Sequence, residues 1–262
     1  MRELFELRGS LTNKQRITLG ILGGVFLLVV WCGASYFGLV RKSILPMPTD
    51  VLGAFPELFG KDRLLMHARY STLLNVVGYF EAILIALPVG FAIGLVPLLR
   101  GLFLPYISAL RYLPLSATMG LFILAFGIAT NMKIQFLTMA ALVYLVPQVV
   151  GRIDEVEEIY LQTVQTLGAT KWQRVRYVFM PLVISRLFSD LVVLFGISWT
   201  YIIIAEVVNT SDGGLGALAI AYARASRTDK VYAVLIVILL IGFAADKIGK
   251  GIDRLIFRYK YA

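Results

Sequence analysis

Residues 17–40 read ITLGILGGVFLLVVWCGASYFGLV and contain no charged side chain. A helix needs about 20 consecutive apolar residues to cross the hydrocarbon core of a bilayer, so this stretch predicts a membrane-spanning helix. The run is too long for the apolar part of a cleaved signal peptide, and no clear small-residue cleavage site follows it. We therefore expect it to stay in the protein as the first of several spans.

Further apolar runs follow along the chain. They are Ser71–Leu99, Tyr112–Met132, Ile134–Gly151, Leu191–Ala205 and Val231–Ala245. The shorter run Gly101–Leu110 is interpreted as an interfacial segment or an early turn of the third span. Apolar residues make up 59% of the 262 residues and charged residues only 16%, whereas soluble domains are about a quarter charged. The sequence therefore predicts an all-α membrane protein with six transmembrane helices.

The 25 Lys and Arg residues are distributed unevenly between the two sides of these spans. With a cytoplasmic N-terminus, 16 of them lie inside and 9 outside, and an excess of basic residues marks the cytoplasmic side. Both termini are therefore expected in the cytoplasm. The net charge of +9 lies beside apolar runs and forms no separate basic domain, so membrane lipid is the expected partner and nucleic acid is not.

Two domains are expected from this organisation. Residues 1–70 hold the N-terminal tail, the first span and an external loop, and residues 71–262 hold the other five spans with a long cytoplasmic loop over residues 152–190. The external connection Arg41–Tyr70 contains Pro46, Pro48 and Pro56 and predicts a loop followed by a short surface helix.

A second external connection, Thr210–Lys230, contains the sequence DGGLG at residues 212–216. We interpret this glycine cluster as a tight turn leading into a re-entrant or interfacial helix, in preference to a phosphate cradle. The chain has no P-loop, because Gly249-Lys250 is followed by Gly251 and not by Ser or Thr. If ATP drives this protein, another subunit must bind it.

The cytoplasmic loop Arg152–Asp190 has a definite helical pattern. Its apolar residues from Ile153 to Leu167 fall at helical spacing, and Gly168 follows where a C-terminal cap belongs. Residues 170–173, TKWQ, have the capping-box pattern that begins a second helix, and Pro181 predicts its end or a kink. The result is a rigid projection that could receive force from a partner, although a helix lying on anionic lipid headgroups would look similar.

Residues 162–181, QTVQTLGATKWQRVRYVFMP, resemble the EAA loop of bacterial ABC importer permeases. Other short segments resemble the same family in order, and the resemblance covers roughly Ser71–Phe257. These segments are RYLPLSA at residues 111–117, LAFGI at 124–128, IAE at 204–206, GLG at 214–216 and TD at 228–229. Together they are similar to the nitrate, sulfonate, taurine and bicarbonate branch. The chain departs from the family where Glu-Ala-Ala is replaced by Gln162-Thr163-Val164, which removes a charge often used to contact the ATPase.

The resemblance implies a type I ABC importer permease fold in a bacterial inner membrane, with a small anion as substrate. Its implied partners are ABC ATPase subunits, a periplasmic or lipid-anchored substrate-binding protein, and a second permease. The second permease is expected to be another copy of this chain, forming a homodimer, with a sister subunit as the alternative. ATP and Mg would be bound by the ATPase, so this chain is expected to hold no cofactor and to perform no catalysis. The implied ATPase-coupling residues are Gln162, Thr163, Val164, Gly168, Ala169, Thr170, Lys171, Trp172 and Pro181.

Ser116, Thr118, Ser198 and Glu206 are the candidate pathway or gate residues. An unpaired carboxylate at the depth of Glu206 is costly, so this residue should face the protein interior or water and have a partner. We prefer a bracing role, with hydrogen bonds to the turn at residues 209–216, over a role as a substrate ligand.

Two other classes of protein fit this sequence less well than a permease does. A secondary transporter or channel without an ATPase partner would usually show internal repeats and several intramembrane ionisable groups; we find no repeat, and only Glu81, Asp190 and Glu206 qualify. A membrane enzyme is disfavoured because single residues, His67 and Cys32, leave no metal cluster and no Cys–His pair.

Overall fold

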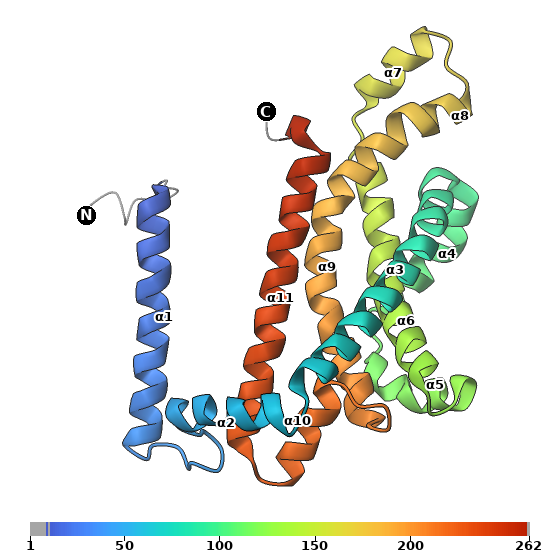
Figure 1. Cartoon of the computed structure of the whole chain (residues 1–262). Helices are drawn as coiled ribbons and strands as arrows, with labels where there is room; N and C mark the ends of the chain where they lie inside the picture. Colours follow the sequence, from blue (N-terminus) through green and yellow to red (C-terminus); the bar gives the residue numbers. More distant parts are fainter. Residues whose placement is uncertain (1–8, 10, 261–262) are drawn as a thin grey trace. The chain divides into compact units, whose positions relative to one another are not determined.

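The computed structural model describes Gly9 and residues 11–260, and within these residues the chain is all-α (Figure 1). The long helices are α1 (Asn13–Tyr36), α3 (Leu64–Leu95), α6 (Thr130–Asp154), α9 (Met180–Val208) and α11 (Thr228–Ile256). The short helices are α2 (Pro48–Gly60), α4 (Pro97–Leu110), α5 (Met119–Phe126), α7 (Glu158–Thr166), α8 (Lys171–Arg174) and α10 (Leu215–Arg224). Among the described residues, five helical segments are long and apolar enough to cross a membrane, with α8 and α9 counted as one.

The third predicted span, Tyr112–Met132, is not one helix. Instead α4 and the segment Leu115–Phe126, which is a 3₁₀ turn followed by α5, meet at a bend of 92°. Pro114 interrupts the chain because it lacks an N–H and disfavours helix in the residue before it. Gly127 then ends α5 at φ 74°, a conformation that glycine adopts without strain. A sixth span therefore exists only if the bent pair is counted as one.

The chain divides into two compact units. One consists of residues 63–221 and 234–262, and the other contains the residues before 63 together with residues 222–233. The boundary that we expected between residues 70 and 71 stays a prediction.

The larger unit is built around α3 and α6. Small residues recur every fourth position on the face of α3 that meets α6: Gly78, Ala82, Ala86, Gly90 and Gly94. A Cβ at Gly90 would lie 2.6 Å from Val149 Cβ, and one at Gly94 would lie 2.5 Å from Ile153 Cδ1. Small residues let membrane helices approach closely, so this row fixes how near α6 comes to α3.

The smaller unit contains α1 and α2. Thr12 begins α1 with a capping box shared with Gln15, and no residue in the apolar window of α1 is buried. Trp31 Nε1 donates to the carbonyl of Pro46 at 3.0 Å, which fixes the loop between the two helices. The helix predicted in this connection is present as α2.

Candidate functional site

The cytoplasmic loop is held by a glycine turn and a helix cap. Gly168 has φ 78°, as its position between two helices predicts. Its N–H donates to the carbonyl of Gln165, and the N–H of Ala169 donates to the carbonyl of Val164, both at 3.0 Å. These two bonds form the motif that commonly ends a helix at glycine. The predicted capping box is also present, since Gln173 N donates to Thr170 Oγ1 and Gln173 Oε1 accepts from Thr170 N.

The first helix of this loop begins later than expected. Helix α6 continues to Asp154, and α7 begins only at Glu158. Ile153 and Val156 are buried in a cluster with residues of α6 and α9. The apolar residues between 153 and 167 are therefore divided between the end of α6, the break after it and α7. The second helix differs too, because α8 runs into α9 through a π-helical turn at Val175–Phe179. This turn precedes Pro181, which cannot donate a helical hydrogen bond.

Most of the proposed coupling residues lie on the surface of this projection. Val164 and Ala169 are half-buried, and the other proposed residues are exposed. Trp172 is 66% exposed and its neighbour Leu167 is 80% exposed. A hollow of about 620 Å³ opens between α7 and the start of α9, with Tyr160, Val164 and Tyr177 in its walls. Large apolar side chains on a rigid, hollowed surface are typical of a contact with another protein.

An ion-pair clamp joins the two ends of the loop. Arg152 on α6 donates to both carboxylate oxygens of Asp190 on α9, from Nε at 2.6 Å and from Nη2 at 2.7 Å. Arg152 also contacts Glu155 in the break between α6 and α7. Arg186 Nη1 donates to the backbone carbonyl of Glu155 at 2.6 Å. Bidentate Arg–carboxylate pairs fix geometry strongly, so α6 and α9 are tied together where the loop leaves and returns.

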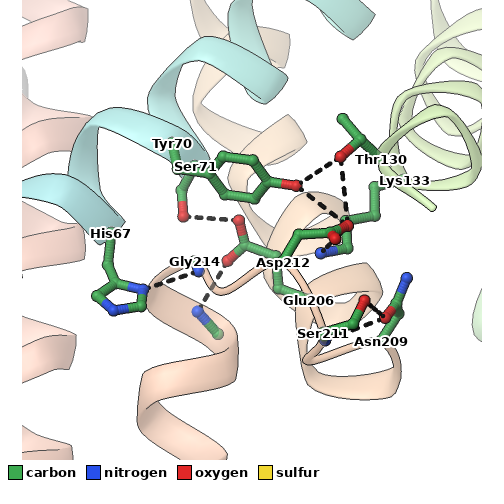
Figure 2. Close-up of polar contacts among 11 residues, drawn as sticks. His67, Tyr70, Ser71, Thr130, Lys133, Glu206, Asn209, Ser211, Asp212 and Gly214 are labelled. Carbon is green, nitrogen blue, oxygen red and sulfur yellow. Dashed lines mark hydrogen bonds and ion pairs between the residues drawn. The ribbon is translucent and has the colours of Figure 1, made fainter.

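Glu206 lies near the C-terminal end of α9, far along this helix from Asp190, and it is wholly buried. Its Oε1 accepts from Ser71 Oγ at 2.6 Å, and its Oε2 accepts from the N–H of Gly216 at 2.8 Å (Figure 2). The N–H of Leu215 donates to Ser71 Oγ at 2.8 Å, and the N–H of Gly214 donates to His67 Nδ1 at 3.0 Å. The first N–H groups of α10 are therefore satisfied by side chains from α3 and α9, and the carboxylate lies where a helix N-terminus favours negative charge.

The glycines at 213 and 214 leave room for the side chains of His67 and Glu206. Gly213 and Gly214 have φ of 83° and 109°. A Cβ at Gly214 would overlap the Glu206 carboxylate, and one at Gly213 would lie 2.9 Å from the His67 ring. The sequence DGGLG is thus the predicted tight turn followed by a short helix. The N-terminus of that helix, where an anion could bind, is occupied by the Glu206 carboxylate. The hydrogen bond between Glu206 and this turn is present as expected.

The turn between α9 and α10 (residues 209–214, the α9–α10 turn) is also held from α6. Asp212 Oδ2 lies 3.2 Å from Thr130 Oγ1, 3.4 Å from Tyr70 Oη and 3.5 Å from Lys133 Nζ (Figure 2). The Lys133 side chain is fully buried, and its ammonium group makes no hydrogen bond within the described part of the chain. A buried charge is costly unless it is paired, so Asp212 is the main compensation for Lys133.

The four candidate pathway residues occupy three separate places. Ser116 and Thr118 lie in the 3₁₀ turn before α5, where Thr118 Oγ1 donates to the carbonyl of Leu115. Ser198 is buried in the middle of α9, with its Oγ 2.8 Å from Asn75 Oδ1 on α3. No hydrogen bond within residues 11–260 joins any two of the four candidates. Their role in a pathway stays a prediction.

Sequence reasoning missed Lys133, Asp212 and Ser71. Lys133 is one of the nine basic residues counted outside, and it separates two apolar runs. A lone charge between two such runs is itself a signal of an intramembrane group. Nothing local distinguishes Ser71, which meets Glu206 from 135 residues away.

Comparisons with known proteins agree with this architecture. The taurine transport system permease protein TauC of Escherichia coli (strain K12) is 29% identical over 238 residues, which are 89% of this chain and 86% of that protein. The putative aliphatic sulfonates transport permease protein SsuC of Bacillus subtilis (strain 168) is 23% identical over 241 residues, covering 92% and 87%. The MetNI methionine ABC transporter, solved in inward-facing conformations, aligns with a TM-score of 0.66 at 20% identity, over 77% of this chain and 98% of that one; this likeness shows the fold.

These relatives are transport permeases, and none of them supports the alternative of a secondary transporter or channel without an ATPase. The sequence also matches the family described as "Binding-protein-dependent transport system inner membrane component" over residues 82–258. Since this match covers more than half of the chain, the protein belongs to the family of inner-membrane components of binding-protein-dependent transport systems.

Proposed function

We propose that this permease imports small sulfonates, of the taurine and alkanesulfonate class, and receives the force for transport through the α7–α8 projection. The observation that carries the coupling role is the helical projection itself, with a capped glycine turn at its tip. Its apolar tip is exposed at Leu167 and Trp172, and its base is clamped between α6 and α9 by Arg152 and Asp190.

The substrate class rests on the relatives. TauC and SsuC are named for taurine and aliphatic sulfonates, and both align over most of their length. Nitrate and bicarbonate, the other substrates of the expected branch, are the alternatives that the uptake test separates from sulfonates. Glu206 suits a bracing role here, since both of its oxygens already accept hydrogen bonds within the chain.

The proposed assembly contains two ATPase subunits, a soluble binding protein that delivers the substrate, and a second permease copy. ATP and Mg would be held by the ATPases, in a bacterial inner membrane with both termini of this chain in the cytoplasm. Closure of the ATPase dimer would move the projection. Because α8 is continuous with α9 through the π-helical turn, that motion would pass directly into a membrane helix. The protein would act by differential stabilisation of two conformations.

The test is uptake by a complex reconstituted in proteoliposomes with its ATPase and binding protein. We expect ATP-dependent uptake of taurine or short alkanesulfonates, with nitrate and bicarbonate much weaker. Preference for nitrate or bicarbonate would refute the substrate class while leaving the coupling role intact.

A separate crosslinking experiment tests the coupling role. In a Cys32→Ser background, a cysteine introduced by Ala169→Cys should crosslink to the ATPase in the assembled complex. Free labelling of that cysteine in the complex, or capture by lipid probes, would refute the coupling role whatever the substrate.

A further inference from the structure

Helix α2 has two apolar faces, and the chain covers only one of them. Val51, Ala54 and Leu58 are buried, at 1%, 3% and 0% exposure. The adjacent row, about 100° further around the helix, consists of Leu52, Phe55 and Phe59. Leu52 is 66% exposed and Phe59 is 51% exposed, and the rings of Phe55 and Phe59 stack with centroids 6.0 Å apart. We call this second row the outer row of α2.

The buried face of α2 is fixed by ion pairs at its C-terminal end. Glu57 lies 2.9 Å from Lys230 Nζ and 3.4 Å from Arg227 Nη2, and Asp62 lies 2.7 Å from Lys230 Nζ. The hydrogen bond from Lys230 lowers the pKa of the Glu57 carboxyl, so the carboxyl is ionised at neutral pH. These contacts hold α2 to the first turn of α11 and settle which row of α2 faces outward.

The orientation of α2 within its unit points to a membrane surface. Helix α1 is a membrane span with none of its apolar window buried, so its axis crosses the bilayer. Helix α2 lies crosswise to α1, near the C-terminal end of α1 (Figure 1). Trp31, whose side chain donates to the carbonyl of Pro46, is of a residue type that is enriched at membrane interfaces. A helix crosswise to a span at its end lies along the plane of the bilayer surface.

The charges around the outer row match phospholipid headgroups. Arg41 and Lys42 precede α2 and Lys61 follows it, and all three are exposed. A helix with an apolar row and flanking basic residues binds at the boundary between headgroups and acyl chains. A protein partner is the weaker alternative, because lysine is depleted in protein interfaces and two of the three flanking basic residues are lysines.

We propose that α2 is an interfacial membrane anchor. Its outer row lies at the acyl boundary, with Arg41, Lys42 and Lys61 at the phosphates. Through the ion pairs to Lys230 and Arg227, the anchor sets the depth at which α11 begins. The proposal rests on the membrane assignment and is independent of the substrate.

Spin labels test this placement in the complete complex, reconstituted in nanodiscs of phosphatidylethanolamine and phosphatidylglycerol. In a Cys32→Ser background, labels are attached to Leu52→Cys, Phe59→Cys and, as the matched control on the same helix, Asp50→Cys. Collision with dissolved oxygen, which concentrates in lipid, is compared with collision with a water-soluble nickel chelate. The oxygen-to-nickel ratio should be several-fold higher at Leu52 and Phe59 than at Asp50.

Equal ratios at the three positions would overturn the proposal. So would a label at Leu52 that is open to nickel in the resting complex and becomes immobilised only when the binding protein is added, since the outer row would then be a protein docking surface. Assembly of each variant is checked by ATP-dependent uptake.

Discussion

Gly214 allows a buried carboxylate to lie inside the first turn of α10. Its φ is 109°, and a Cβ there would overlap Glu206. We expect Gly214→Ala to destabilise the protein by at least about 2 kcal/mol, because positive-φ strain adds to the loss of hydrogen bonds around Glu206. Thermal unfolding in detergent measures this loss as a lower Tm.

The matched control is Gly101→Ala, in a helical position where a Cβ meets nothing within 4 Å. It should leave the Tm unchanged or raise it, because alanine stabilises a helix by up to about 1 kcal/mol over glycine. Equal effects of the two substitutions would mean that Glu206 does not constrain residue 214.

Substitution of Asp212 should lower the stability of the protein much more than substitution of Lys133. Asp212→Asn removes the carboxylate that faces the buried ammonium and should cost up to about 3–5 kcal/mol. Lys133→Met removes the buried charge at similar volume and should be neutral or stabilising, and it should rescue Asp212→Asn in the double variant. A Lys133→Met variant less stable than Asp212→Asn would contradict this order and indicate another use for the ammonium group.

At the scale of elements, the α7–α8 projection depends on one glycine. Gly168 has φ 78°, so Gly168→Val should distort the turn while leaving membrane insertion intact. We expect ATP hydrolysis by the assembled complex to continue while ATP-dependent uptake is lost. The ratio of substrate imported to ATP hydrolysed is the measurement.

Gly168→Asn is the control, because asparagine tolerates positive φ better than other non-glycine residues. It should retain much of the coupling. Normal uptake by the valine variant would refute the coupling assignment and favour a helix that lies on lipid.

The ion pair between Arg152 and Asp190 should also affect coupling. Asp190→Asn should lower stability by about 1–2 kcal/mol, less than for a fully buried pair, because both side chains are partly exposed. It should also lower the ratio of transport to ATP hydrolysis, since α6 and α9 would no longer move together.

The exposed pair Lys250–Asp246 on α11 is the control for the clamp. Asp246→Asn should change stability by less than about 1 kcal/mol and leave coupling unchanged. If Asp190→Asn lowers stability but not the transport ratio, the clamp is structural only.

At the scale of the whole molecule, the charge distribution predicts orientation. Sixteen of the 25 basic residues would lie in the cytoplasm if both termini do. A green fluorescent protein fused after Ala262 should fluoresce, and alkaline phosphatase inserted after Lys61 should be active. Active phosphatase at the C-terminus, with fluorescence from an insertion after Lys61, would reverse the assignment.

Several features could be predicted from the sequence because they depend on neighbours along the chain. Apolar length located five of the six spans, because the bilayer selects a helix by the number of consecutive apolar residues. Their ends were less well determined: the first span was predicted at residues 17–40 and is found at Asn13–Tyr36. The Gly168 turn, the Thr170 cap and the DGGLG turn were predicted because glycine conformation and capping hydrogen bonds are local.

The remaining features needed the tertiary structure. The bend between α4 and Leu115–Phe126 lies between two segments that are both apolar, so hydropathy did not reveal it, although Pro114 lies in the break. The apolar residues from Ile153 to Leu167 looked like one helix, yet Ile153 and Val156 pack against α9. Burial of Lys133 and pairing of Glu206 with Ser71 join residues far apart in sequence, and such contacts exist only once α3, α6 and α9 are packed together.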